Sequence, residues 1–267
     1  MVIDFHTHCF PARIAGGALE KLARNAGALR RFTDGTLEGL KRHMAESRVD
    51  LAVVLNIATS PAQQRAVNDF AVSQAGDGIV PFGSVHPLAP DAAEELERIA
   101  AAGLRGVKFH PQFQRFAIDD PAVYPIYRKA AALGLITVFH TGLDLGFADS
   151  ALASPAALAR ALPEFSGAPV VAAHLGGCMC WQEVMGSLTG LPVYFDTAFC
   201  HGHIPLPEAQ ALIDKHGTNK ILFGSDLPWS GMAGELDFIS CLGLGDEDTQ
   251  RILHRNAAGL LGIPQTE

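Results

Sequence analysis

The stretch VIDFHTHCF, from Val2 to Phe10, places two histidines one residue apart at the end of a short apolar run. Short, apolar, β-branched runs predict β-strands. Because side chains alternate between the faces of a strand, His6 and His8 share one face, roughly 6 to 7 Å apart, and Thr7 points away. Two imidazoles at that offset can converge on one ion. Alone, the pair fits equally well a metal site or a chance pair in a chain with 11 histidines.

Length and composition favour one globular domain over residues 1–267. Of the 267 residues, 48% are hydrophobic and 18% are charged, so the chain can bury a large core, and α/β barrels reach this length undivided. The formal net charge of −8 leaves no basic field for a phosphate backbone. We therefore expect a small-molecule substrate rather than nucleic acid.

The sequence predicts neither export nor membrane insertion. Met1 leads directly into a predicted strand without a secretory signal pattern, and no apolar stretch approaches the ~20 residues of a membrane span. The five cysteines are odd in number and scattered, which favours reduced thiols over a disulfide framework. We expect a cytoplasmic protein without a membrane partner, and a homodimer is the first assembly to test because dimers are the commonest soluble oligomers.

Short apolar segments alternate with longer Ala- and Leu-rich segments along the whole chain, a pattern typical of repeated βα units. The eight predicted strands are Val2–His8, Asp50–Ile57, Ile79–Val85, Leu104–His110, Leu135–His140, Pro169–His174, Pro192–Thr197 and Lys220–Asp226. Predicted helices between them include Thr36–Ser47, Pro61–Gln74, Pro90–Gly103 and Pro121–Gly134.

Eight strands with interposed helices in about 250 residues predict an α/β fold, a single-domain (β/α)8 TIM barrel. The alternative is an open doubly wound sheet, but no Gly-x-Gly-x-x-Gly turn follows the first strand. Two stretches are predicted to lie over the barrel mouth. Ala12–Asp34 is expected to be a helix and loop, and Thr141–Ser150 a long loop.

The predicted strands end in residues that can bind metals or move protons. In a (β/α)8 barrel these ends meet at one rim, where active sites lie. The residues at these ends are His6 and His8, Lys108 and His110, His140, His174, and Asp226. Histidines and aspartates that converge on a rim usually serve a metal or catalysis. Zinc, manganese or iron would accept such ligands.

Several motifs resemble, in order, those of the amidohydrolase superfamily. They are DFHTHCF, GVKFHP, VFHTG, VVAAHLGG, YFDTA, ILFGSDLPW and RILHRNAAGLLG. The chain is most similar to the subgroup of small metal-dependent hydrolases that also holds aminocarboxymuconate-semialdehyde decarboxylase. The resemblance covers nearly the whole chain and is weakest in the two stretches expected over the mouth.

The resemblance implies that His6, His8, His140 and Asp226 hold a divalent ion, most often zinc, with Mn²⁺ or Fe²⁺ as alternatives. It implies that His174 is a general acid/base or a further ligand. The chemistry agrees, because a bound divalent ion lowers the pKa of water from about 15.7 towards about 7. Asp226 could then accept a proton and pass it to the leaving group, and His174 could stabilise an oxyanion.

Lys108 bears on the number of metals. In dinuclear members of the superfamily, a lysine at the end of strand 4 is carboxylated and bridges two ions. We favour a role for Lys108 in binding a substrate carboxylate or pairing with an acid, since lysine is a point charge for anions. His110 shares its face and would line the site. Trp229 follows Asp226 closely enough to form a pocket wall, with a packing role as the alternative.

Other candidates carry less weight. Arg13 would meet an anionic substrate or lie on the surface, and His43, His216 and His254 are expected to be solvated or helix-terminal. The sequence lacks a Gly-x-Ser-x-Gly nucleophile elbow, so serine catalysis finds no support.

Three functions follow from this pattern. The first is a metal-dependent hydrolase that cleaves an amide, lactone or similar bond. The second is a metal-dependent, non-oxidative decarboxylase, ranked lower because no paired-arginine clamp for a carboxylate is evident. The third is a binding protein that retains the metal site, which a complete ligand set argues against.

Overall fold

The computed structural model describes residues 1–147 and 151–264, and within these ranges eight parallel strands form the centre of the protein. The strands are β1 (Ile3–Thr7), β2 (Leu51–Leu55), β3 (Ile79–Phe82), β4 (Gly106–Phe109), β5 (Ile136–Phe139), β6 (Val170–Ala172), β7 (Tyr194–Asp196) and β8 (Ile221–Leu222). Neighbours in sequence pair in parallel within two runs, β1 to β3 and β4 to β8.

Backbone hydrogen bonds join the two runs into a closed barrel. Between β3 and β4, the Lys108 N–H donates to the Gly83 carbonyl oxygen at 2.8 Å. Between β8 and β1, the Phe5 N–H donates to the Phe223 carbonyl oxygen at 2.7 Å. Closure removes the sheet edges. The predicted (β/α)8 barrel is thus confirmed, and the open doubly wound sheet is wrong.

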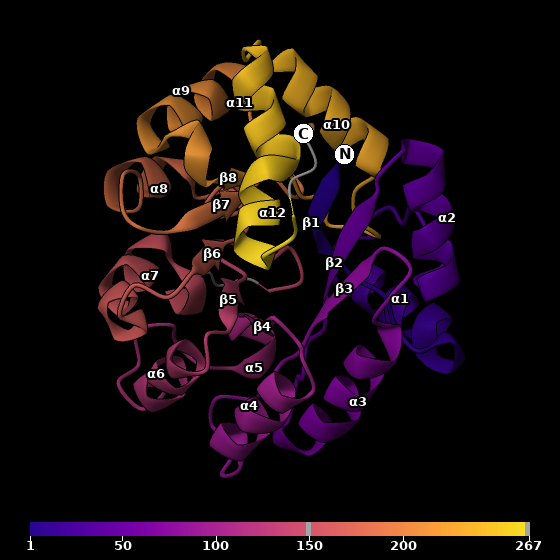
Figure 1. Cartoon of the computed structure of the whole chain (residues 1–267), viewed down its shortest axis with the longest axis vertical. Coiled ribbons are helices and arrows are strands. Elements are labelled where there is room, and N and C mark those ends of the chain that lie inside the picture. The colour runs from indigo at the N-terminus through magenta and orange to yellow at the C-terminus, as the bar shows by residue number, and fades with distance from the viewer. Residues whose placement is uncertain (148–150, 265–267) are drawn as a thin grey trace.

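Helices surround the barrel (Figure 1). The α-helices are α1 (Ala12–Asn25), α2 (Leu37–Ser47), α3 (Gln64–Gln74), α4 (Ala92–Ala101), α5 (Pro111–Gln114), α6 (Tyr124–Ala132), α7 (Pro155–Ala161), α8 (Trp181–Ser187), α9 (Leu206–His216), α10 (Met232–Cys241), α11 (Asp246–Gln250) and α12 (Asn256–Leu261). The four predicted helices coincide with α2, with a 3₁₀ turn (Pro61–Gln63) plus α3, with α4 and with α6. Within the described ranges, no helix is both long and apolar enough to cross a membrane.

The strands are shorter than predicted. β6 ends at Ala172 and β8 at Leu222, whereas the predicted strands ran on to His174 and Asp226. His174 and Asp226 have φ angles of 61° and 70°, in the left-handed region that non-glycine residues rarely adopt. The prediction was too long because the apolar runs continue beyond the last strand pairing. Such conformations cluster at functional sites, where the surrounding structure must hold them.

The second half of β1 contains an irregularity. The register between β1 and β2 shifts by one residue between Asp4 and Thr7, which is where His6 lies. An extra residue in one strand re-aims the side chains around it, and bulges are common beside active sites. The Asp4 carboxylate accepts the His6 N–H at 3.0 Å and the Ser225 N–H at 2.9 Å, which supports the irregular backbone.

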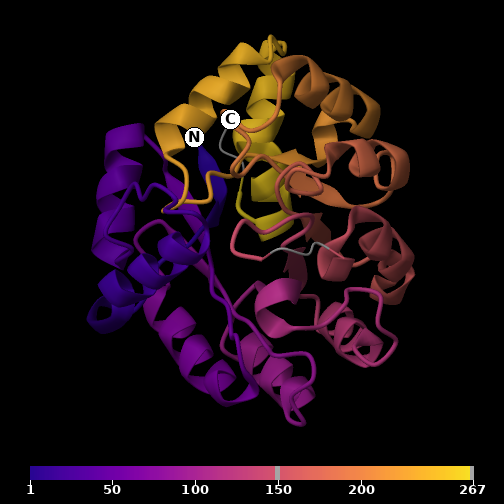
Figure 2. The same cartoon turned by 180° about the vertical axis from the view of Figure 1, so that it is seen from behind.

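Different elements cover the two ends of the barrel. α12 crosses in front of the strands in Figure 1 and shares an apolar cluster with Ile3 at the start of β1. α1 follows β1 at the opposite end, which faces the viewer in Figure 2. The prediction of a helix and loop over Ala12–Asp34 is confirmed. The two ends of this segment, which we call the α1 excursion, are joined by a hydrogen bond in which the Phe10 N–H donates to the Gly35 carbonyl oxygen at 2.8 Å. In the predicted loop Thr141–Ser150, residues 148–150 lie outside the described residues.

Candidate metal centre and substrate cavity

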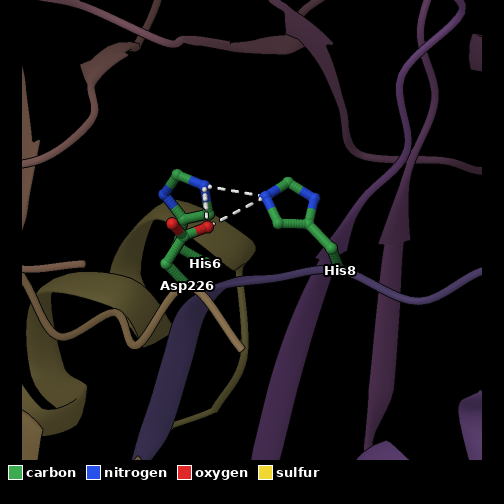
Figure 3. A group of neighbouring side chains, drawn as sticks. All are labelled: His6, His8 and Asp226. Atoms are coloured by element: carbon green, nitrogen blue, oxygen red, sulfur yellow. Dashed lines mark hydrogen bonds and ion pairs between the residues drawn. The ribbon is translucent and has the colours of Figure 1, made fainter. Parts of the chain in front are cut away.

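His6, His8 and Asp226 converge at the carboxyl end of the barrel (Figure 3). The Nε2 atoms of His6 and His8 are 3.2 Å apart. Asp226 Oδ1 lies 3.1 Å from His8 Nε2 and 3.5 Å from His6 Nε2. Ligand atoms at about 2.0 to 2.1 Å from a tetrahedral zinc lie about 3.3 Å from one another. The three ligand atoms therefore have the spacing of three corners of a tetrahedral site.

The outward nitrogens of both histidines have acceptor partners. His8 Nδ1 lies 2.8 Å from the Leu55 carbonyl oxygen, and His6 Nδ1 lies 2.8 Å from Asp196 Oδ2. Because a carbonyl or carboxylate oxygen only accepts, each Nδ1 carries the proton and each Nε2 presents a lone pair. Two lone pairs that face each other cannot form a hydrogen bond, whereas a cation between them would use both. The donor set therefore fits a divalent ion, and the outward hydrogen bonds are those that orient metal-ligating histidines.

His140 and His174 lie beside this trio. His174 Nδ1 donates to the Ala198 carbonyl oxygen at 2.9 Å, so its Nε2 also presents a lone pair, 3.1 Å from His140 Nδ1. The His174 ring lies 5.1 Å from the His6 ring. His140 Nε2 is buried and has no hydrogen-bond partner among the described residues. His140, which the resemblance implies as a ligand beside the trio, thus lies within hydrogen-bond distance of His174, and its ligand atom groups with His110 and Asp144 rather than with the trio.

Asp196 at the end of β7 supports the site, and the sequence analysis did not include it. Its Oδ2 accepts from His6 and its Oδ1 accepts the His174 N–H at 2.9 Å and the Ala198 N–H at 3.1 Å. Burial raises its pKa. The strand-end rule that selected Asp226 applies equally to Asp196 and would have found it.

Lys108 lies inside the site. Its side chain is buried, and Nζ lies 3.4 Å from His6 Nε2. Burial lowers the pKa of Lys108 to about 8, against the raising effect of the Asp196 and Asp226 charges. Burial of the His6 ring, together with the charge of Lys108, holds the pKa of His6 well below its usual value. For Asp226, burial is the largest effect and raises the pKa, but the combined effects of the neighbouring His8, His6 and His174 outweigh it and the pKa is lowered.

His110 forms a second polar group with Asp144, a residue of the loop after β5 that the sequence analysis missed. His110 Nε2 lies 3.2 Å from Asp144 Oδ2. The His110 ring stacks on His140 with centroids 4.2 Å apart and planes within 9° of parallel. The ligand atoms of His110, His140 and Asp144 lie within 4.8 Å of one another, so these residues form a second group that could hold an ion, although the stacked rings place their nitrogen lone pairs in separate planes. His110 therefore lies in the cavity, as predicted, but as a partner of Asp144.

A cavity of about 560 Å³ opens above these residues. His6, His8, Lys108, His110, His140, His174, Asp226 and Trp229 all line it. Its size is in the range of sites for small organic ligands. The half-buried Trp229 forms part of its wall, and the exposed Arg13 lies at its edge. The predicted site residues are thus brought to one cavity.

His216 is helix-terminal, as predicted, but it is not solvated. It ends α9 with only 5% of its surface exposed and stacks on Phe195 of β7. Its Nε2–H donates to the Val193 carbonyl oxygen at 2.9 Å, while Nδ1 accepts the Gly190 N–H at 3.2 Å. Burial lowers its pKa to about 4. A histidine with both nitrogens satisfied by backbone is a structural residue. His43 and His254 are half-buried.

Fold and site together define a (β/α)8 barrel with a candidate metal centre at the carboxyl ends of its strands. The family model described as amidohydrolase matches residues 3–263, and the chain belongs to this family. The resemblance seen in the sequence motifs is thereby confirmed.

Solved structures share this fold over nearly their whole length. An uncharacterised TIM-barrel protein from Bordetella bronchiseptica has a TM-score of 0.76 and 20% identity, with 98% of each chain covered. The 5-carboxyvanillate decarboxylase from Sphingomonas paucimobilis has a TM-score of 0.73 and 17% identity, covering 98% of this chain and 99% of the other. A probable 2-pyrone-4,6-dicarboxylic acid hydrolase from Acinetobacter baumannii has a TM-score of 0.68 and 19% identity, with the same coverage. No curated protein matches the sequence.

Proposed function

We propose that this protein is a metal-dependent hydrolase that cleaves an amide, lactone or similar bond of a small substrate. The observation that carries the proposal is the trio of His6 Nε2, His8 Nε2 and Asp226 Oδ1, spaced 3.1 to 3.5 Å apart. The outward hydrogen bonds of the two histidines leave their lone pairs free for an ion. Membership of the amidohydrolase family supports a divalent metal, and zinc is our prediction for its identity.

In this proposal, the trio would hold the ion together with His140 or His174. A divalent ion there supplies an acidified water as nucleophile and polarises the bond to be cleaved. Asp226 accepts the proton of the attacking water and returns it to the leaving group. His174, where it stays off the metal, would take up a proton at Nε2 before it could donate to the developing oxyanion, because its Nδ1–H already donates to the Ala198 carbonyl oxygen. Lys108 and His110 bind the polar part of the substrate, and Trp229 forms a wall beside it.

A decarboxylase is the second candidate, because a buried Lys108 in the cavity offers a cation to a substrate carboxylate. Decarboxylases also occur among the proteins that share the fold. Against this, Arg13 is the only arginine among the described residues that line the cavity, and it is exposed. One lysine and one peripheral arginine do not form a paired clamp. The hydrolase therefore ranks first.

The test combines metal content with product analysis. Elemental analysis of the purified protein should find at least one divalent ion per chain, and His6→Ala should lose it. His43→Ala is the matched control, since His43 lies on α2 and contacts Ser47. A panel of amides, esters and lactones should yield acids with consumption of water. Release of carbon dioxide from a carboxylated substrate instead would select the decarboxylase. Wild-type protein that binds no divalent ion would refute both candidates.

The cytoplasmic location and the homodimer remain predictions. Fractionation of the native cells and light scattering of the purified protein test them.

A further inference from the structure

Helix α1 has two apolar stripes. Ala15, Leu19 and Ala23 are buried against the body of the protein. A second stripe, one residue earlier in each turn, lines the cavity and consists of Ile14, Ala18 and Leu22. A helix that only covers a barrel needs one apolar stripe and turns polar residues to solvent. The second stripe, which we call the α1 wall, therefore requires another explanation.

Apolar residues of other elements face the same space. Val67 and Phe70 of α3 line the cavity, as do Phe113 and Phe147. In the loop after β5, Leu145 also lines it. Ile14 and Leu145 remain 45% and 37% exposed. Large apolar side chains gathered around an open cavity mark a surface that a ligand covers.

The cavity thus has a polar end and an apolar end. The polar end holds the trio and Lys108, and the apolar end is the α1 wall with the apolar side chains named above; the polar side chains of Asn25, Thr59 and Gln63 also line the cavity. The α1 wall offers no polar side-chain atom, so a charged group placed there would lose its hydration without gaining a partner. Arg13 precedes the wall and is exposed at the edge of the cavity.

We propose that the substrate is a carboxylic acid derivative with an uncharged apolar chain or ring, which lies along Ile14, Ala18 and Leu22 while its reactive carbonyl group lies at the trio. This substrate class rests on the proposed function, because the metal centre fixes the polar end. The α1 wall then determines specificity, and it does so without taking part in the chemistry.

Alkanehydroxamic acids test the proposal by binding alone. Their hydroxamate group chelates zinc and stays constant while the alkyl chain grows from acetohydroxamic to hexanohydroxamic acid. Isothermal titration of the zinc-loaded wild-type protein should show affinity rising about threefold to fourfold for each methylene that becomes buried. Across the series this amounts to about two orders of magnitude. Succinic acid monohydroxamate, which has a charged end, should bind no better than acetohydroxamic acid.

Two matched variants locate the effect. Ala18→Phe fills the space beside the α1 wall, and Lys21→Phe adds a phenylalanine to the same helix at an exposed position outside the cavity lining. Ala18→Phe should weaken hexanohydroxamic acid at least tenfold and leave acetohydroxamic acid within about twofold, as burial of about two methylenes is lost. Lys21→Phe should leave the whole series unchanged. Thermal unfolding confirms that both variants fold.

The outcomes separate this inference from the proposed function. Affinity that is independent of chain length, or preference for the charged hydroxamate, would overturn the α1 wall proposal while the metal centre stands. An equal effect of both phenylalanine variants would also overturn it. If no hydroxamate binds to the zinc-loaded protein, the zinc is not open to this cavity and the inference is overturned, whereas loss of the metal centre itself is recognised separately, by the absence of bound metal in elemental analysis.

Discussion

Two aspartates at the ends of neighbouring strands differ in what surrounds them. Asp196 ends β7 and is fully buried, and three N–H donors occupy its two carboxylate oxygens. Asp226 follows β8 with 8% of its surface exposed, and its Oδ1 faces the lone pairs of His6 and His8. The barrel brings both carboxylates to one rim, but the donors around each decide its use. Asp196 holds His6 and His174 in place through hydrogen bonds, whereas the Asp226 carboxylate is left to bind a metal or accept a proton.

Asp226→Asn is expected to have the largest effect on activity. Because the amide cannot accept a proton from water and is a weaker ligand, we expect kcat to fall by about 10³-fold, within the range of acid–base contributions. Turnover of the best substrate from the panel by zinc-loaded protein measures this. Asp214→Asn, at an exposed position of α9, is the matched control and should leave kcat unchanged. Retention of more than a tenth of the activity in Asp226→Asn would show that another group moves the proton.

Asp196→Asn should have a smaller effect, and it should act on the affinity for zinc rather than on proton transfer. The amide can still accept the two backbone N–H groups, but it no longer offers a carboxylate to His6 Nδ1–H. Loss of such a support typically weakens metal affinity by about 10- to 100-fold. Competition with a zinc chelator measures this, and a zinc-saturated sample should recover most of its activity. An unchanged zinc affinity would contradict the supporting role assigned to Asp196.

Glu235 of α10 holds together the loops that follow the two aspartates. Its Oε2 accepts the His201 N–H at 3.0 Å and the Cys200 N–H at 3.3 Å, and its Oε1 contacts the Ser230 hydroxyl at 2.6 Å. Glu235→Ala leaves these buried donors unpaired and should lower the free energy of unfolding by about 1.5 kcal/mol. Urea denaturation measures the change. An effect below about 0.5 kcal/mol, the usual level for surface substitutions, would show that the loops hold without it.

The pH dependence of the same residue gives the finest test. Burial raises the pKa of Glu235 from 4.5 to about 8, so the folded protein prefers the neutral acid. The stability it contributes is fully present below pH 4.5 and is lost as the pH rises through about 8, because only the unfolded chain ionises freely in between. Glu235→Gln keeps a neutral side chain and should escape this loss. Urea unfolding at pH 5 and pH 8 should therefore show a smaller decrease for the variant, and parallel decreases would contradict the assignment.

Much of the fold and the centre of the site could be predicted from local pattern. Alternating apolar runs predicted the barrel, and the rule that active sites lie at strand ends selected His6, His8 and Asp226. The apolar runs extended two strands too far, since His174 and Asp226 themselves have positive φ angles, which an apolar run does not reveal.

Other features depend on contacts between distant residues. The role of Asp196 is set by His6, which is 190 residues away in sequence, and no spacing encodes that pair. Asp144 stands in a loop whose path brings it to His110, again without a local signal. The two stripes of α1 are readable as a helical period, but only packing decides that Leu19 faces the core and Leu22 the cavity.

The closed base of the α1 excursion has a consequence for variation among related chains. Because the hydrogen bond between Phe10 and Gly35 joins its two ends, the segment between them can change without moving β1, provided that Asp34, which accepts from Thr36 at the start of α2, is kept. The entropic cost of a closed loop grows slowly, by about 0.6 kcal/mol for each doubling in length. Grafting another segment in place of residues 11–33 should therefore change the ligands that this barrel accepts while the metal centre is retained.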